Sequence, residues 1–301
     1  MSIRPSIRQW EWTVVGLSVV AMACGPDRGR QLETSLKDRI AETDAEVVAV
    51  YLHDLESGDS LAIDAGVVLH AASMMKVSVM IQAFRDVDAS RLRLDDELTV
   101  TGSFRSVVDG SPYELRVGED SDTTLYARLG ERATVRELVE LMITVSSNLA
   151  TNVLIEHLGA DRIQLLNHEL EAHSMMLIRG VEDLKAYEAG INNRTNASDM
   201  GSLFGAIAEG RAASDSSCRQ MIELLARQEF SAGIPAGLPA NARVAHKTGR
   251  ITRINHDGGI VYTGGGERYV LVVLTSGIDD PSVSDRLIAD LSDLVYRFIA
   301  G

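Results

Sequence analysis

The chain has 301 residues, of which 45% are hydrophobic and 24% are charged, and its formal net charge is −14 at pH 7. This length suits one large globular unit or two intimate lobes that bury most of their apolar surface. The negative charge argues against a nucleic-acid partner, because a phosphate backbone needs basic stripes and the sequence shows none.

The N-terminus has the proportions of an export signal. Two arginines precede an apolar stretch over residues 13–23, which is shorter than the roughly 20 residues that a membrane-spanning helix needs. The stretch ends in a small-x-small triplet, and Cys24 follows directly, resembling the acylated cysteine of bacterial lipoproteins. We therefore expect residues 1–23 to be a signal peptide, and the mature protein to be periplasmic or anchored to a membrane through Cys24. Cys218 would then have no internal disulfide partner.

Helical and strand patterns follow one another in three blocks. The first block predicts a helix and two strands, at residues 32–42, 47–52 and 56–64. The middle block has the apolar spacing of helices, at residues 134–145, 148–159, 197–210 and 218–228. The last block returns to strands and closes with an amphipathic helix, at residues 242–249, 258–277 and 284–300.

Strands at both chain ends with helices between them predict an α/β plus all-α fold. We expect an antiparallel sheet that is built from both chain ends and flanked by helices, with an inserted all-helical lobe. Residues 30–66 and 213–301 would form the sheet-and-helix lobe, and residues 67–212 the helical lobe. Residues 109–122 are polar and rich in turn formers, which predicts a long surface loop.

Ser73 and Lys76 stand in a segment that is apolar on nearly every side of a predicted helix. A lysine in a buried helix must lose its charge or find a partner. The 29 basic residues include only four lysines, at positions 37, 76, 185 and 247. Where charge alone is needed this chain uses arginine, so the remaining lysines mark places where arginine would not serve.

Two further short motifs lie downstream. Ser-Ser-Asn at residues 146–148 stands at the junction of two predicted helices, and Lys-Thr-Gly at residues 247–249 ends a predicted strand. A serine-x-x-lysine alone is a weak signal. The three patterns occur once each, however, in the order in which penicillin-recognising serine enzymes carry them. From Leu32 to the C-terminus the chain resembles a class A β-lactamase-type serine hydrolase of the β-lactamase and penicillin-binding protein superfamily.

The resemblance implies roles for the first two motifs. Ser73 at a helix N-terminus would be the nucleophile, and Lys76, one turn further on the same face, would accept its proton if burial lowers the pKa of the lysine. Ser146 would relay a proton to the leaving nitrogen, and Asn148 would hydrogen-bond the substrate amide or Lys76. Ser-Ser-Asn is also an ordinary N-cap, so a structural role stays open.

The third motif would bind the substrate. Lys247 and Thr248 would hold the carboxylate of a penicillin or a D-Ala-D-Ala stem, and Gly249 would leave room for the substrate backbone. The backbone N–H groups of Arg250 and Ser73 would form the oxyanion hole, as the resemblance implies. The side chain of Arg250 either adds positive charge at the rim or belongs to a solvated strand end.

Residues 179–199 would form the active-site loop. In class A enzymes a glutamate on this loop activates the deacylating water, and an asparagine follows four positions later. Glu182 lies at about the expected distance past Asn148, but an alanine stands four positions on. Glu188 has an asparagine at that interval, yet it comes later than expected. Glu182 is the favoured base, Glu188 is the rival, and a purely structural loop is the third possibility.

The resemblance implies a serine hydrolase that acts on small β-lactams through an acyl-enzyme on Ser73. The N-terminal pattern predicts that it is exported, and we expect a monomer. One alternative is a D-alanyl-D-alanine peptidase or penicillin-binding protein that acts on cell-wall stem peptides. Another is a non-catalytic penicilloyl-binding protein. No cofactor or metal is expected, because the seven histidines have no metal-ligand spacing. His256 either faces the cleft or is a simple hairpin residue.

Overall fold

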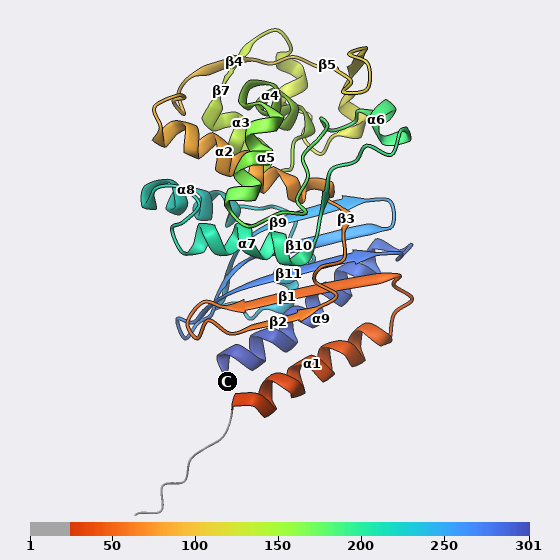
Figure 1. Ribbon diagram of the computed structural model, residues 1–301, viewed down its shortest axis with the longest axis vertical. Helices are drawn as coiled ribbons and strands as arrows, with labels where there is room; N and C mark the ends of the chain where they lie inside the picture. The colour runs from red at the N-terminus through yellow and green to blue at the C-terminus, as the bar shows by residue number, and fades with distance from the viewer. Residues whose placement is uncertain (1–24) are drawn as a thin grey trace, which may run out of the picture.

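The computed structural model of the protein describes residues 25–301, so the expected signal peptide and Cys24 lie outside the described residues. Figure 1 shows two terminal helices at the bottom, a sheet above them, and a group of helices that forms the upper part of the molecule. Within residues 25–301, no helix is both long and apolar enough to cross a membrane.

The main sheet is antiparallel and has the strand order β2-β1-β11-β10-β9. Its strands are β1 (Val47–Asp54), β2 (Ser60–Ile63), β9 (Arg243–Ile251), β10 (Ile254–Tyr262) and β11 (Arg268–Ser276). Strands from the two ends of the chain therefore lie side by side, as predicted.

The side chains of β11 alternate between two hydrophobic cores, because successive residues of a strand point to opposite faces. Leu271 and Val273 belong to the core shared with the terminal helices α1 (Gly25–Ala41) and α9 (Pro281–Ala300). Val272 and its neighbours on the other face belong to the core of the upper helices, where α7 (Ala197–Ala208) packs on the sheet.

The upper helices surround α2 (Lys76–Asp88), whose first nine residues are all buried. The other helices are α3 (Val135–Thr144), α4 (Asn148–Leu158), α5 (Ala160–Glu169), α6 (Leu184–Glu188) and α8 (Asp215–Leu225). The single 3₁₀ turns are η1 (Ala72–Met75), η2 (Val117–Glu119), η3 (Leu125–Arg128) and η4 (Ile234–Gly237). The short strands pair as β3 (Leu69–His70) with β8 (Arg194–Thr195), β4 (Glu97–Thr99) with β7 (Arg132–Thr134), and β5 (Ser103–Arg105) with β6 (Pro112–Glu114).

Two predicted elements differ from the structure. The expected strand at residues 56–64 is shorter, because the Asp54 carboxylate accepts the N–H of Glu56 at 2.8 Å and makes a turn before β2. The expected surface loop at residues 109–122 includes β6 and η2. Its polar residues bind backbone groups of neighbouring segments, which local sequence patterns do not reveal.

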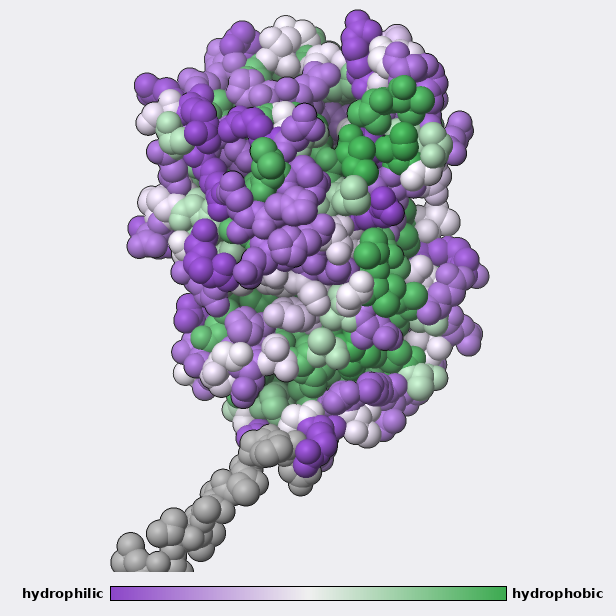
Figure 2. Space-filling view, in the orientation of Figure 1, coloured by the Kyte–Doolittle hydropathy of each residue, from purple (hydrophilic) through white to green (hydrophobic). Residues whose placement is uncertain are grey.

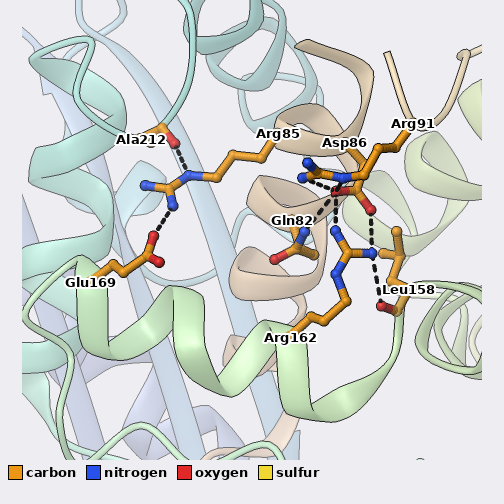
Figure 3. Close-up of polar contacts among 8 residues, drawn as sticks. All are labelled: Gln82, Arg85, Asp86, Arg91, Leu158, Arg162, Glu169 and Ala212. Atoms are coloured by element: carbon orange, nitrogen blue, oxygen red, sulfur yellow. Dashed lines mark hydrogen bonds and ion pairs between the residues drawn. The ribbon is translucent and has the colours of Figure 1, made fainter. Parts of the chain in front are cut away.

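A buried charge joins α2 to α5, as Figure 3 shows. Asp86 is 3% exposed, and its carboxylate accepts hydrogen bonds from Gln82, Arg91 and Arg162. Arg85, on the same helix, instead pairs with the exposed Glu169 at 2.5 Å. The network around Asp86 therefore fixes how α5 sits against α2.

Figure 2 shows apolar groups gathered on the side of the molecule where α6 lies. Exposed large apolar residues of α6 and of the β5–β6 hairpin are Val107, Val108, Leu184 and Tyr187. The hairpin contacts the α6 region through the Val107 N–H, which donates to Asp183 at 3.0 Å.

Candidate active site

Ser73 lies in η1, directly before α2, and lines a cleft between the upper helices and the sheet. The preceding residue, Ala72, has a φ of +46°, in the left-handed region that residues other than glycine rarely adopt. His70 holds this conformation, because its Nδ1 accepts the Ala72 N–H at 3.0 Å. Backbone strain of this kind is common at functional sites.

His256 of β10 supports the same segment. It is fully buried, its Nε2 donates to the His70 carbonyl at 3.0 Å, and its Nδ1 accepts the Thr275 N–H at 3.2 Å. Burial lowers the pKa of His256 to about 4, so the ring is neutral at physiological pH. The structure thus shows a strand residue that supports the segment before Ser73.

Lys76 is fully buried, and its ammonium is bound by the turn at residues 146–148. Nζ donates to the Ser146 carbonyl at 2.7 Å, to Ser146 Oγ at 3.2 Å and to Asn148 Oδ1 at 2.8 Å. Burial lowers the pKa of Lys76 to about 7, against the smaller raising effects of Asp120 and Glu182. A lysine in this state can accept a proton near neutral pH.

Lys247 is also fully buried, and it points at the same serine. Its Nζ donates to Ser146 Oγ at 3.0 Å and to the Thr248 carbonyl at 2.9 Å. Burial and, to a lesser degree, the charge of Lys76 lower the pKa of Lys247 well below its usual value. The expected contact of Lys247 with a substrate carboxylate stays a prediction, since this ammonium lies against Ser146.

Gly249 brings β9 close to Ser73. A Cβ at this position would lie 3.1 Å from the Ser73 backbone nitrogen and 3.2 Å from Ala72 Cβ. The room that glycine leaves is therefore occupied by η1, which sets the spacing between Ser73 and the strand edge.

The cleft has a volume of about 570 Å³ and is bordered by all three motifs. Ser73, Ser146, Asn148, Thr248 and Arg250 all line it. The Arg250 guanidinium pairs with Asp285 of α9. No cluster of three or more histidine, cysteine or acidic side chains suited to a metal ion occurs in residues 25–301.

The two glutamates proposed as bases lie in different surroundings. Glu182 is half-buried, and its pKa is raised by burial first and then by the charge of Glu119, while Lys76 is close enough to lower it. Its carboxylate forms no hydrogen bond within the described part of the chain. Glu188 is exposed at the end of α6. The structure thus brings Glu182 toward Lys76 and leaves Glu188 in solvent.

Sequence reasoning missed residues that anchor the active-site loop. Asn152 of α4 accepts the Val181 N–H at 2.7 Å and donates to the Val181 carbonyl at 3.0 Å. Asn193 makes three such bonds to the backbone of Ile178 and Arg179. One signal was present: asparagine is a weak helix former, yet it stands twice, one turn apart, in α4.

Known proteins with similar sequences cover nearly the whole chain. The model of a family described as the beta-lactamase enzyme family matches residues 31–299. A β-lactamase of Streptomyces fradiae is 26% identical over 97% of this chain and 96% of its own length. A β-lactamase of Streptomyces albus G is 27% identical over 81% of this chain and 77% of its own length.

Solved structures share the fold. PBP-A has a TM-score of 0.78 at 27% identity, covering 89% of this chain and 95% of its own. Its L158E mutant, solved as an acyl-enzyme complex with penicillin G, has a TM-score of 0.76 at 26% identity, covering 89% of this chain and 96% of its own. An ancestral class A β-lactamase matches with a TM-score of 0.77 at 24% identity over 89% of this chain and 99% of its own, which supports the fold alone. With the three motifs gathered at one cleft and a family match over residues 31–299, the chain belongs to the beta-lactamase enzyme family.

Proposed function

We propose that the protein is a serine β-lactamase that opens the β-lactam amide through an acyl-enzyme on Ser73. The observation that carries this proposal is the position of Ser146 between two buried lysines. Lys76 and Lys247 donate to Ser146 Oγ at 3.2 and 3.0 Å. A hydroxyl held by two amines beside a nucleophilic serine can pass a proton to a leaving group.

In the proposed acylation, Ser73 Oγ attacks the β-lactam carbonyl carbon and its proton passes to Lys76. The carbonyl carbon–nitrogen bond then breaks. Ser146 gives its hydroxyl proton to the leaving nitrogen and takes a proton back from Lys76, which returns the lysine to its neutral form. The N–H groups of Ser73 and Arg250 would stabilise the oxyanion in the tetrahedral intermediate.

In the free protein, Lys76 is not yet in the hydrogen-bonded arrangement with Ser73 that this step requires. Its Nζ bonds to residues 146–148, and no hydrogen bond within the described residues joins it to Ser73 Oγ. Catalytic hydrogen bonds are often long in free enzymes and tighten when substrate binds. Rotation of the Ser73 hydroxyl toward Lys76 would complete the proton path.

The substrate carboxylate would bind at Thr248 and Arg250. Both residues line the cleft, and the guanidinium of Arg250 stays charged at every physiological pH. Asp285 restrains that guanidinium from α9, while Lys247 donates to Ser146. Lys247, whose contact with the carboxylate stays a prediction, would act beside Thr248 and Arg250 in holding this group.

Glu182 is proposed to take the proton of the deacylating water. Burial raises its pKa, and Lys76 lies near enough to interact with its charge. Water would attack the ester carbonyl carbon while Glu182 takes one of its protons. The bond between that carbon and Ser73 Oγ would then break, and the proton taken by Glu182 would return to Ser73 Oγ.

Intact-protein mass spectrometry after mixing with benzylpenicillin tests both half-reactions. Wild type should show a transient adduct and turn over a chromogenic cephalosporin steadily, and Ser73→Ala should show neither. Glu182→Gln should accumulate the adduct, because a general base contributes about 10²- to 10⁴-fold. Glu188→Gln is the matched control and should behave as wild type. A persistent adduct in Glu188→Gln alone would move the base to Glu188.

A penicillin-binding protein or D-alanyl-D-alanine peptidase is the second candidate function. It is favoured by the Glu182 carboxylate, which no hydrogen bond within residues 25–301 orients, and by the similarity to PBP-A. A persistent adduct in the wild type with release of D-alanine from a stem peptide would establish this alternative. A persistent adduct without such release would indicate the non-catalytic penicilloyl-binding protein.

We also propose that the protein is exported as a monomer and tethered through an acylated Cys24. The proposal rests on the apolar stretch at residues 13–23, which ends directly before this cysteine. Cys24→Ala should move the protein from the membrane fraction to the soluble periplasm with unchanged activity. Wild-type protein that is already soluble and carries no lipid would mean ordinary secretion instead.

A further inference from the structure

Residues 117–122, expected to belong to a free surface loop, contact the turn that binds Lys76; we call this segment the brace. Its Asp120 carboxylate accepts the Asn148 N–H at 2.9 Å and the Leu149 N–H at 2.9 Å. The Tyr126 hydroxyl donates to the same carboxylate at 3.0 Å and orients it. A carboxylate from outside α4 thus binds the backbone at the start of that helix.

The contact completes the N-terminus of α4. A helix leaves its first N–H groups without intrahelical partners and carries a partial positive charge there. The Ser147 side chain, as N-cap, accepts only the Ala150 N–H at 3.2 Å. The Asp120 carboxylate accepts the Asn148 and Leu149 N–H groups, which the Ser147 side chain does not reach. Its negative charge is also favourable at the positive end of the helix.

The turn that this carboxylate holds is strained. Ser146 has a φ of +60°, and its carbonyl accepts both Lys76 Nζ at 2.7 Å and Ser121 Oγ at 3.3 Å. Ser121 Oγ also donates to the Val145 carbonyl at 2.7 Å. The brace therefore holds the backbone on both sides of Ser146. Every hydrogen bond that Lys76 Nζ makes within the described chain goes to Ser146 or Asn148.

Three titratable groups face Lys76 from the elements packed around it. Asp120 comes from the brace, Glu182 from the active-site loop and Lys247 from β9. Asp120 acts on the pKa of Lys76 more strongly than Glu182 does, and both oppose the effect of burial. Ser73 and Ser146 contribute uncharged hydroxyl groups.

We propose that Asp120 is a positioning residue of this site: it holds the turn that binds Lys76 and places a negative charge beside that lysine. The expected effect of Asp120 on acylation rests on the proposed function. Its role in holding the turn does not. The scarcity of lysine makes a direct test practical, because only four lysine side chains exist to be resolved.

The test compares Asp120→Asn, Asp120→Glu and Asp122→Asn. Asp122 is buried in the same segment and accepts from Thr124, so its substitution removes an equal charge without touching α4. Protein labelled with ¹³C at the lysine Cε is titrated by NMR, and the Lys76 signal is assigned by its loss in Lys76→Arg. Acylation by a fluorescent penicillin is measured from pH 5 to 9, together with the melting temperature.

In Asp120→Asn the Lys76 titration should move to lower pH by about half a unit or more, because a negative charge next to the ammonium is lost. The acid limb of the acylation rate should move with it, and the plateau rate should fall about 10-fold as the turn loosens. Asp120→Glu should keep the titration near that of the wild type while acylating more slowly. Asp122→Asn should leave the Lys76 titration unchanged.

An unmoved Lys76 titration in Asp120→Asn would overturn the proposal, even if the melting temperature fell. An equal shift of the Lys76 titration in Asp122→Asn would overturn it as well, because any lost negative charge in the brace would then have the same effect. Failure of the proposed function looks different: wild type would form no adduct at any pH, while the NMR titration would still decide what Asp120 does.

Discussion

Lys76 and Lys247 are both fully buried, although lysine is a residue type that almost never is. They share Ser146, and burial lowers the pKa of each. A guanidinium cannot lose its proton at these pH values, and its planar fork needs more room than an ammonium. This explains why two of the four lysines in an arginine-rich chain stand here.

The pH dependence of acylation should follow Lys76. Below about pH 7 the lysine becomes protonated and cannot accept the Ser73 proton, so the acylation rate should fall as the pH is lowered through this value. Lys76→Arg should acylate about 10²- to 10⁴-fold more slowly at every pH. Lys185→Arg, at an exposed lysine paired with Asp109, is the matched control and should keep the wild-type profile. A fluorescent penicillin measures all three proteins, and full activity in Lys76→Arg would contradict the role of the lysine.

Gly249→Ala should lower the acylation rate strongly and the free energy of unfolding modestly. The new Cβ, 3.1 Å from the Ser73 nitrogen, would push β9 away from the nucleophile or shift η1. Overpacking of this kind costs about 1–3 kcal/mol, and a displaced oxyanion donor costs about 10²- to 10³-fold in rate. Gly66→Ala is the control, because a Cβ there meets nothing within 4 Å. Equal rates for the two variants would show that the spacing does not matter.

The sequence predicted the groups that carry the proposed chemistry, because Ser73, Lys76 and Ser146 belong to short motifs with fixed internal spacing. Ser73 and Ser146 line one cleft and Lys76 hydrogen-bonds to Ser146, which agrees with the motif resemblance. Asp120 and Asn152 were not predicted, since each acts on the backbone of a distant segment; the only local signal was the unusual asparagine inside α4, which does not name its partner. Whether Glu182 is the base stays a prediction.

The elements that surround the site are fixed by a few polar anchors as well as by apolar packing. The active-site loop is held by Asn152 and Asn193, while the Arg179 guanidinium lies over the Tyr187 ring and donates to the Gly180 carbonyl. The helices and central strands were predictable from apolar periodicity. The brace and the loop anchors were not, because they depend on contacts between segments far apart in the sequence.

Asn152→Ala should loosen the active-site loop. The Val181 N–H and carbonyl would lose their side-chain partners, which costs about 1–3 kcal/mol of unfolding free energy. Acylation should change little, but the adduct should persist longer, because Glu182 follows Val181 directly. Asn192→Ala, which removes a single bond to Arg179, is the milder control. Denaturant unfolding measures the loss of stability, and mass spectrometry measures the adduct lifetime. An unchanged lifetime would show that the Asn152 contacts do not affect deacylation.

Asp86→Ala should destabilise the upper helices. It removes the buried carboxylate that the Arg91 and Arg162 guanidinium groups share. Because both guanidinium groups are more than a third exposed and can turn to solvent, the loss should be about 1–3 kcal/mol. Glu169→Gln breaks the neighbouring exposed pair with Arg85 and should cost less than about 1 kcal/mol. Denaturant midpoints compare the two, and similar losses would mean that burial of Asp86 is not what matters.

At the scale of the whole molecule, buried neutral bases make stability depend on pH. His256 has a pKa of about 4 in the native state against an ordinary value of 6.5, so between these values the unfolded chain binds a proton that the native protein does not. Lys76, with a pKa of about 7 against 10.5, behaves in the same way at higher pH. Both groups therefore make stability rise with pH, each within its own window.

Lowering the pH from 6.5 to 4 should remove about 3 kcal/mol of unfolding free energy through His256. Urea unfolding at several pH values measures this loss. His256→Gln should reduce the slope of stability against pH in that window, although it also lowers stability at neutral pH by disturbing the bonds to His70 and Thr275. His157→Gln, at an exposed position, should keep the full slope. An unchanged slope in His256→Gln would assign the acid sensitivity to other groups.

The strand order β2-β1-β11-β10-β9 also governs when the chain can fold during synthesis. β1 needs β11 as its neighbour, and β11 is the last strand to leave the ribosome. Contacts between such distant segments give a high contact order, which slows folding. The five-stranded sheet can therefore be completed only after residue 276 is available, so the export that we propose would act on a chain whose central sheet is still incomplete.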